Sequence, residues 1–272
     1  MRSVFRLLLG LAACGILVFA AVNLVAYVQE SNQSTRLNEN LIEKAVAVNA
    51  PAPQLPDGES IRKPEPEADE HRLPGETAPI AVDFEALLET NEDVVGWLYC
   101  EDTPINLPLV QAEDNDHYLH RLLDGTYNSA GTLFVDCRNA GDFSDKNTIL
   151  YGHNMKNKGM FGTLSNYREQ SYYEAHPVMW LLTPEESFQV ALIAGYVTAS
   201  DSKIYSFGLT EEDVSTLVEK SIKQSTFQSG FQAAQADRYV TLSTCSYEYD
   251  NARYVLLGCL RSLDSDEIGR EN

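Results

Sequence analysis

The pattern of apolar and polar positions divides the chain into distinct parts. Residues 7–28, LLLGLAACGILVFAAVNLVAYV, form one apolar run in which Asn23 is the only clearly polar side chain. Residues 30–80 hold seven of the eleven prolines and no aromatic side chain. From residue 81, short apolar runs alternate with polar turns, as in a folded domain. The pattern predicts an apolar N-terminal helix at 1–29, a disordered Pro/acid-rich stalk at 30–80, a folded domain at 81–263 and a polar tail at 264–272. A short helix near LNENLIEKAVAV, residues 37–48, is the one ordered alternative within the stalk.

Eight runs within residues 81–263 have the length and turn-bounded edges of β-strands. Few helical patterns alternate with them, which favours a mostly antiparallel sheet or barrel over a doubly wound fold. The runs are GWLYCED, INLPLVQ, GTLFVDC, NTILYGHN, VMWLLTP, SFQVALIAGYVTA, RYVTLSTC and RYVLLGCL.

Helical patterns occur at three places in this region. VDFEALLETNEDVVGWL begins as an amphipathic helix with Phe84, Leu87 and Leu88 on one side, and NDHYLHRLL indicates a short helix. TEEDVSTLVEKSIKQSTF begins with Thr210 and Asp213 in capping-box spacing. The sequence therefore predicts a capped helix at 210–227, before the strand RYVTLSTC.

The apolar run at 7–28 has the length of a membrane span. At 1.5 Å per residue, 22 residues extend roughly 33 Å, about the thickness of the hydrocarbon core. A cleaved signal peptide has a shorter apolar region, and a lipoprotein box such as LAAC at 11–14 would end the run near Cys14. Arg2 and Arg6 precede the run, so we expect a single-pass signal anchor at the cell membrane, with a cytoplasmic N-terminus and the folded domain extracellular.

Charge excludes one class of partner. The chain carries a net charge of −20, and residues 30–272 hold 18 basic and 40 acidic residues, or 18 − 40 = −22. Such a surface repels phosphate backbones, so we expect no binding to nucleic acid.

The cysteines argue against a disulfide scaffold. Three cysteines lie in apolar strand-like runs, where buried packing is their expected role: Cys100, Cys137 and Cys259. A single disulfide bond between two of the cysteines is the alternative. No two cysteines have CxxC spacing, so a structural zinc site is not expected. No cofactor or metal is predicted.

YVTLSTCSYEYDNARYVLLG, residues 239–258, contains the strongest candidate for chemistry. It reads as two strands joined by a polar turn, with Cys245 ending the first and Arg253 opening the second. In such a hairpin the two residues lie side by side. Strand residues alternate between faces, which groups Val240 with Leu242 and Thr244, and Thr241 with Ser243 and Cys245.

A histidine would complete a catalytic set. His153 closes the apolar strand TILYGH, so it matches the strand-end position of Cys245. A thiolate can attack a carbonyl, a histidine can protonate the leaving amine, and an arginine can stabilise the oxyanion. Each residue has a structural alternative as a strand-end or edge side chain. His117 and His120 have helical metal-ligand spacing, but no third ligand is evident.

These motifs resemble those of the sortases, membrane-anchored cysteine transpeptidases of Gram-positive bacteria. TLSTC is followed by Arg253 eight residues later, and YGHN stands about ninety residues upstream. The helix at 210–227, LYGHNM and the N-terminal helix are similar to the class B branch. The resemblance covers roughly residues 80–263 and implies an eight-stranded sortase-type β-barrel. It also implies Cys245 as nucleophile, His153 as acid/base, Arg253 as oxyanion or substrate stabiliser, and Thr244 in the substrate-binding groove.

The resemblance further implies a reaction and its partners. A C-terminal sorting motif of a secreted protein is cleaved through a Cys245 thioester. The acyl group then passes to a peptidoglycan cross-bridge amine or its lipid-linked precursor. A pilin-polymerising sortase, a hydrolytic cysteine peptidase and a non-enzymatic wall-binding module are the alternatives.

Overall fold

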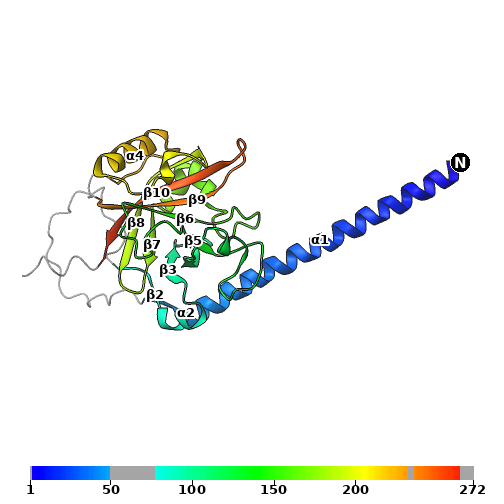
Figure 1. Ribbon diagram of the computed structural model, residues 1–272, viewed down its shortest axis with the longest axis horizontal. Helices are drawn as coiled ribbons and strands as arrows, with labels where there is room; N and C mark the ends of the chain where they lie inside the picture. The colour runs from blue at the N-terminus through cyan, green and yellow to red at the C-terminus, as the bar shows by residue number, and fades with distance from the viewer. Residues whose placement is uncertain (1, 50–76, 232–235, 264–272) are drawn as a thin grey trace, which may run out of the picture.

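The computed structural model describes residues 2–49, 77–231 and 236–263, and its centre is a closed β-barrel (Figure 1). The barrel strands are β3 (Val94–Tyr99), β4 (Asn106–Val110), β5 (Leu133–Val135), β6 (Asn147–Tyr151), β7 (Val178–Leu182), β8 (Ser187–Ala199), β9 (Arg238–Cys245) and β10 (Ala252–Ser262). Their order around the barrel is β10-β8-β7-β3-β4-β5-β6-β9.

The barrel confirms the predicted fold, and each of the eight predicted runs forms one strand. Most neighbouring strands run antiparallel, as expected, but β4–β5 and β6–β9 are parallel. The parallel β6–β9 pair matters most, because it brings the carboxyl ends of two distant strands to the same rim.

Short helices surround the barrel. The predicted capping box of Thr210 and Asp213 is confirmed, and Val214 and Val218 of the helix it begins are buried. In the helix after residue 83, Leu87 is buried, whereas Leu88 is 39% exposed because the helix has only seven residues and one packed face. The helices are α2 (Phe84–Thr90), η1 (His117–His120), η2 (Leu164–Arg168), α3 (Gln170–Ala175), η3 (Lys203–Tyr205) and α4 (Glu211–Gln224).

The N-terminal helix α1 (Arg2–Ala45) projects far from the barrel at its N-terminal end (Figure 1). Within the described chain it is the one helix long and apolar enough to cross a membrane, and its apolar window has no buried share. This fits a membrane anchor or a signal sequence. The C-terminal end of α1 instead packs on the domain.

The predicted stalk at 30–80 differs from the structure in its first part. Residues 30–45 continue α1, and Leu41 and Ala45 are buried against the outside of the barrel. β1 (Val46–Val48) then pairs with β2 (Ile80–Val82). Residues 30–50 contain no proline, and Leu37, Leu41 and Ala45 have the four-residue spacing of a helical face, so this part can fold. Residues 50–76 of the stalk and the tail at 264–272 lie outside the described residues.

We expect Leu41→Ala to lower the free energy of unfolding by about 2–5 kcal/mol, because the leucine is 6% exposed and lies in an apolar cluster with Leu87 and Trp97. Val48→Ala is the control, since Val48 is 82% exposed and its loss should change stability by less than about 0.5 kcal/mol. Urea denaturation measures both. Equal midpoints for the two variants would mean that α1 does not stabilise the domain.

Candidate active site

Cys245 and Arg253 lie opposite each other across the β9–β10 hairpin. Their Cα atoms are register partners, as the hairpin pattern predicted. The turn between the strands is closed by a hydrogen bond from Ser246 N to Ala252 O of 2.9 Å, and Asn251 has a positive φ of 61°. Asparagine tolerates that conformation better than most residues. Both Cys245 and Arg253 are half-buried, so a thiol and a guanidinium stand at one rim of the barrel with access to solvent.

The chain around His153 is bonded to the end of the cysteine strand. Gly152 N donates to Ser243 O at 3.2 Å, and Asn154 Nδ2 donates to Cys245 O at 2.8 Å. His153 lies between these two contacts and therefore stands beside the end of β9. The structure thus brings His153, Cys245 and Arg253 to the same rim, from the neighbouring strands β6, β9 and β10.

The His153 ring is held from a third direction. Nε2 lies 2.8 Å from Leu119 O, and because a carbonyl only accepts, Nε2 carries the proton in this contact. His120 stacks on His153 with ring centroids 5.9 Å apart and planes inclined by 19°. The imidazole is therefore oriented before any substrate binds.

The alternative metal site at His117 and His120 finds no support in the part of the chain that the structure describes. No group of three or more His, Cys, Asp or Glu side chains is arranged there to hold a metal ion. His120 instead contacts the rings of His153 and Tyr127.

Thr244, which the resemblance places in the substrate-binding groove, is buried in this structure. The side chain is 2% exposed, and its hydroxyl donates to Gly152 O at 2.8 Å. It lies on the strand face of Val240 and Leu242, which are both fully buried. In this structure Thr244 ties the end of β9 to the segment that carries His153.

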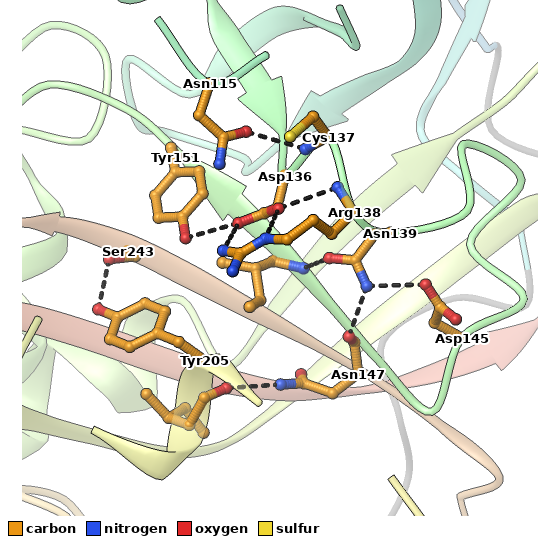
Figure 2. A network of polar contacts seen from close by, with 12 residues as sticks. Asn115, Asp136, Cys137, Arg138, Asn139, Asp145, Asn147, Tyr151, Tyr205 and Ser243 are labelled. Carbon is orange, nitrogen blue, oxygen red and sulfur yellow. Dashed lines mark hydrogen bonds and ion pairs between the residues drawn. The ribbon is translucent and has the colours of Figure 1, made fainter. Parts of the chain in front are cut away.

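The loop after β8, which contains Tyr205, packs against the strand face that carries Cys245. Tyr205 Oη lies 2.8 Å from Ser243 Oγ, on the strand face that also carries Cys245 (Figure 2). Burial raises the pKa of Tyr205 to about 12, so its hydroxyl is protonated at neutral pH. Asn147 Nδ2 donates to Ile204 O at 3.0 Å and fixes the same loop to β6.

The buried carboxylate of Asp136 holds the side chains that pack against this loop. Asp136 is fully buried and accepts hydrogen bonds from Arg138 Nε and Nη2, at 2.9 and 2.8 Å, and from Tyr151 Oη, at 3.0 Å (Figure 2). Tyr151 stacks on Tyr205, and Arg138 lies 4.0 Å from the ring centre of Phe207. Asp136 therefore connects β5 to both the β6 strand and the loop after β8.

Asp136→Asn should lower the free energy of unfolding by about 1.5–3 kcal/mol at pH 7, because the amide nitrogen cannot accept the bonds that the carboxylate accepts. Burial alone would raise the pKa of Asp136, but the hydrogen bonds from Arg138 and Tyr151 outweigh it and hold that pKa below its usual range. A lowered pKa stabilises the fold above the unfolded value of about 3.9, and this contribution is lost as pH falls through the folded value.

The difference between wild type and Asp136→Asn should therefore shrink below about pH 4. Urea unfolding at pH 7 and at low pH measures it, with the exposed Asp250→Asn as control. A difference that is the same at both pH values would contradict the role of the charge.

None of the other cysteines shares the setting of Cys245. All five lie within the described residues and carry free thiols, so no disulfide forms. Cys100 and Cys259 are buried as predicted, and burial raises both of their pKa values, to about 12 for Cys259. Cys137 is half-buried rather than buried, and lies two residues beyond the end of β5.

The sequence contains little or no indication of four residues that contribute to the site: Asn154, Leu119, Tyr205 and Asp136. Asn154 stands next to His153 in YGHN, but its contact with the Cys245 carbonyl depends on the β6–β9 pairing. Leu119 contributes only a backbone carbonyl. No local pattern could reveal either contact.

Comparisons with known proteins agree on one family. No family model matches the chain. A sortase B of Listeria monocytogenes is 38% identical over 177 residues, which cover 64% of this chain and 72% of the relative. A solved Staphylococcus aureus sortase B–substrate complex has a TM-score of 0.62 and 28% identity, and covers 66% of this chain and 84% of that chain. A sortase B complexed with triglycine has a TM-score of 0.61 and 28% identity, with coverages of 66% and 85%.

Proposed function

The chain belongs to the sortase family on its class B branch, and on that premise we propose that it attaches secreted proteins to the cell wall. The family consists of cysteine transpeptidases, so the alternative of a non-enzymatic wall-binding module is set aside. In the proposed reaction the enzyme cleaves a C-terminal sorting motif and transfers the protein to a peptidoglycan amine. The observation that carries the proposal is the convergence of Cys245, His153 and Arg253 at one barrel rim.

The proposed chemistry gives each of the three side chains a separate role. The Cys245 thiolate attacks the scissile carbonyl, and Arg253 stabilises the oxyanion of the tetrahedral intermediate. His153 protonates the leaving amine, which departs and leaves a thioester on Cys245. An acceptor amine then attacks the thioester, gives up a proton to His153 and releases the thiolate. The thioester conserves the acyl energy of the peptide bond, so no ATP is needed.

An amine acceptor is favoured over water by one comparison. A related sortase B has been solved with triglycine, a peptide with a free amino group. We propose a cross-bridge amine or its lipid-linked precursor as the acceptor here. A hydrolytic peptidase would use the same three residues, and a pilin-polymerising sortase would take a lysine amine, so the acceptor separates the alternatives.

We also propose that residues 1–29 form a single-pass signal anchor, with residues 81–263 as the extracellular catalytic domain. The apolar window of α1 and the position of Arg2 and Arg6 before it support this topology. A tethered enzyme of this kind meets secreted substrates as they leave the membrane.

The proposed function can be tested with C-terminal peptides of secreted proteins from the same genome, mixed with the enzyme and triglycine. We expect a mass shift on Cys245 equal to the acyl part of one peptide, and a product joined to triglycine. Cleavage that yields only the free acid, at every triglycine concentration, would favour the hydrolytic alternative. No adduct and no cleavage with any peptide would contradict the proposal.

Arg253→Lys should lower activity about 10²–10³-fold, the typical loss for one oxyanion donor. The charge is kept, but an ammonium cannot copy the rigid planar fork of a guanidinium. Because the oxyanion exists mainly in the transition state, the loss should appear in kcat. Steady-state kinetics with a quenched fluorescent peptide measure it. A rise in KM alone would assign Arg253 to substrate binding. If neither kcat nor KM changes, Arg253 is a solvent-exposed charge at the strand edge without a role in the reaction.

A further inference from the structure

We infer that the face of the catalytic domain around the active-site rim lies against the phospholipid headgroups of the membrane that α1 crosses. This inference rests on the proposed signal anchor. α1 runs unbroken from Arg2 to Ala45, so the apolar run at 7–28 and the part that packs on the barrel belong to one helix. No flexible segment separates the anchor from the domain at this junction, and the helix fixes how far the domain stands from the membrane.

The first contacts of α1 with the domain come directly after the apolar run. Ser129 Oγ donates to the Glu30 carboxylate, and Asn128 Nδ2 donates to Glu30 O at 2.9 Å. Asn157 Nδ2 donates to Ser31 Oγ at 3.0 Å. At 1.5 Å per residue, Glu30 lies only about 3 Å beyond residue 28. The headgroup layer is roughly 5–7 Å deep on each side of the bilayer, so these contacts fall within it.

The loops that touch α1 are the loops that flank the active site. Asn128 N donates to His120 O at 3.0 Å, and the His120 ring stacks on His153. Asn157 lies in the segment that follows His153 directly. Two contacts therefore connect the end of the anchor to the proposed acid/base, and the rim faces the membrane side of the barrel.

The side chains exposed on this side suit a lipid interface. The turn between β9 and β10 points to the side from which α1 projects (Figure 1). Tyr247 and Tyr249 in that turn are 82% and 49% exposed, and Tyr127, next to Asn128, is 67% exposed. Tyrosine is enriched at membrane–water interfaces, because its ring is apolar and its hydroxyl is polar.

The charges on the same loops are mixed. Lys156 and Lys158 are exposed on either side of Asn157 and can meet lipid phosphates. Glu248 and Asp250 alternate with the two tyrosines of the β9–β10 turn. We therefore expect the contact to form on zwitterionic phosphatidylcholine and not to require anionic lipid.

Three tryptophan reporters in the full-length protein, reconstituted in phosphatidylcholine vesicles, test the inference. Tyr247→Trp probes the rim, and Val48→Trp is a matched control, since both positions are 82% exposed and Val48 lies beyond the far end of α1. Phe19→Trp probes the anchor itself. The native Trp97 and Trp180 are 0% and 6% exposed, and their signal is subtracted with the wild type.

A nitroxide on the lipid headgroup should quench the emission of Tyr247→Trp at least about twofold, because an interfacial side chain contacts the label. It should leave Val48→Trp unchanged, and an acyl-chain nitroxide should quench Phe19→Trp. Tyr249→Trp and Tyr127→Trp repeat the measurement if Tyr247→Trp misfolds. Quenching at position 19 with none at the three rim positions would overturn the inference and leave the anchor standing. No quenching at position 19 would overturn the anchor and the inference with it.

Discussion

Cys245→Ala should abolish both cleavage and transfer of a sorting-motif peptide, with a loss of about 10⁶-fold, the scale found when the nucleophile of a covalent protease is removed. Of the three proposed catalytic side chains, Cys245 alone is the nucleophile, because His153 and Arg253 serve as proton donor and cation. The fold should persist, since the bond from Asn154 goes to the backbone carbonyl of residue 245 and survives the substitution. Circular dichroism and urea denaturation check this.

Cys137→Ala is the matched control for that variant. Cys137 is the other half-buried cysteine of the catalytic domain, so loss of its thiol changes a similar volume at a similar exposure. Its activity should stay within a few-fold of wild type. A thiol reagent should block the wild type and Cys137→Ala equally. If Cys245→Ala retains more than a trace of turnover, Cys245 is not the nucleophile.

The fold was predictable because each strand can be recognised from its own short stretch of sequence. Each of the eight runs carries its own apolar content and turn-bounded edges, so the barrel strands appear without knowledge of their partners. The Cys245–Arg253 pairing was predictable for the same reason, since a short turn fixes the register of a hairpin. α1 continues through 30–45, where the sequence indicated only a short helix near 37–48. The stalk prediction averaged composition over 30–80, although the prolines begin only at Pro51.

The rest of the site depends on contacts that no local pattern records. The bonds from Asn154 and Gly152 to β9 cross about ninety residues of sequence and need the parallel β6–β9 pair. In the sequence, Asp136 is an ordinary carboxylate at the end of a strand. Only the structure shows that Arg138 and Tyr151 donate hydrogen bonds to it. Strand alternation had already placed Thr244 with Val240 and Leu242, and its buried position follows that pattern.

His153→Ala should lower kcat about 10²–10⁴-fold, the usual contribution of general acid–base catalysis. The leaving amine must gain a proton as the tetrahedral intermediate collapses, and the His153 ring is held beside the end of the cysteine strand. His120→Ala is the control, because His120 is exposed and stacks on the same ring. Its activity should change only a few-fold, since Leu119 O still orients His153.

A role in proton transfer can be separated from a role in packing. His153→Gln keeps an N–H that can donate to Leu119 O but cannot titrate, so it should be as inactive as His153→Ala on a peptide. A thioester substrate has a leaving group that departs without protonation, so both variants should recover most of the acylation rate on it. A Gln variant that is active on the peptide, or Ala and Gln variants that stay equally slow on the thioester, would mean that His153 positions the site and does not transfer the proton.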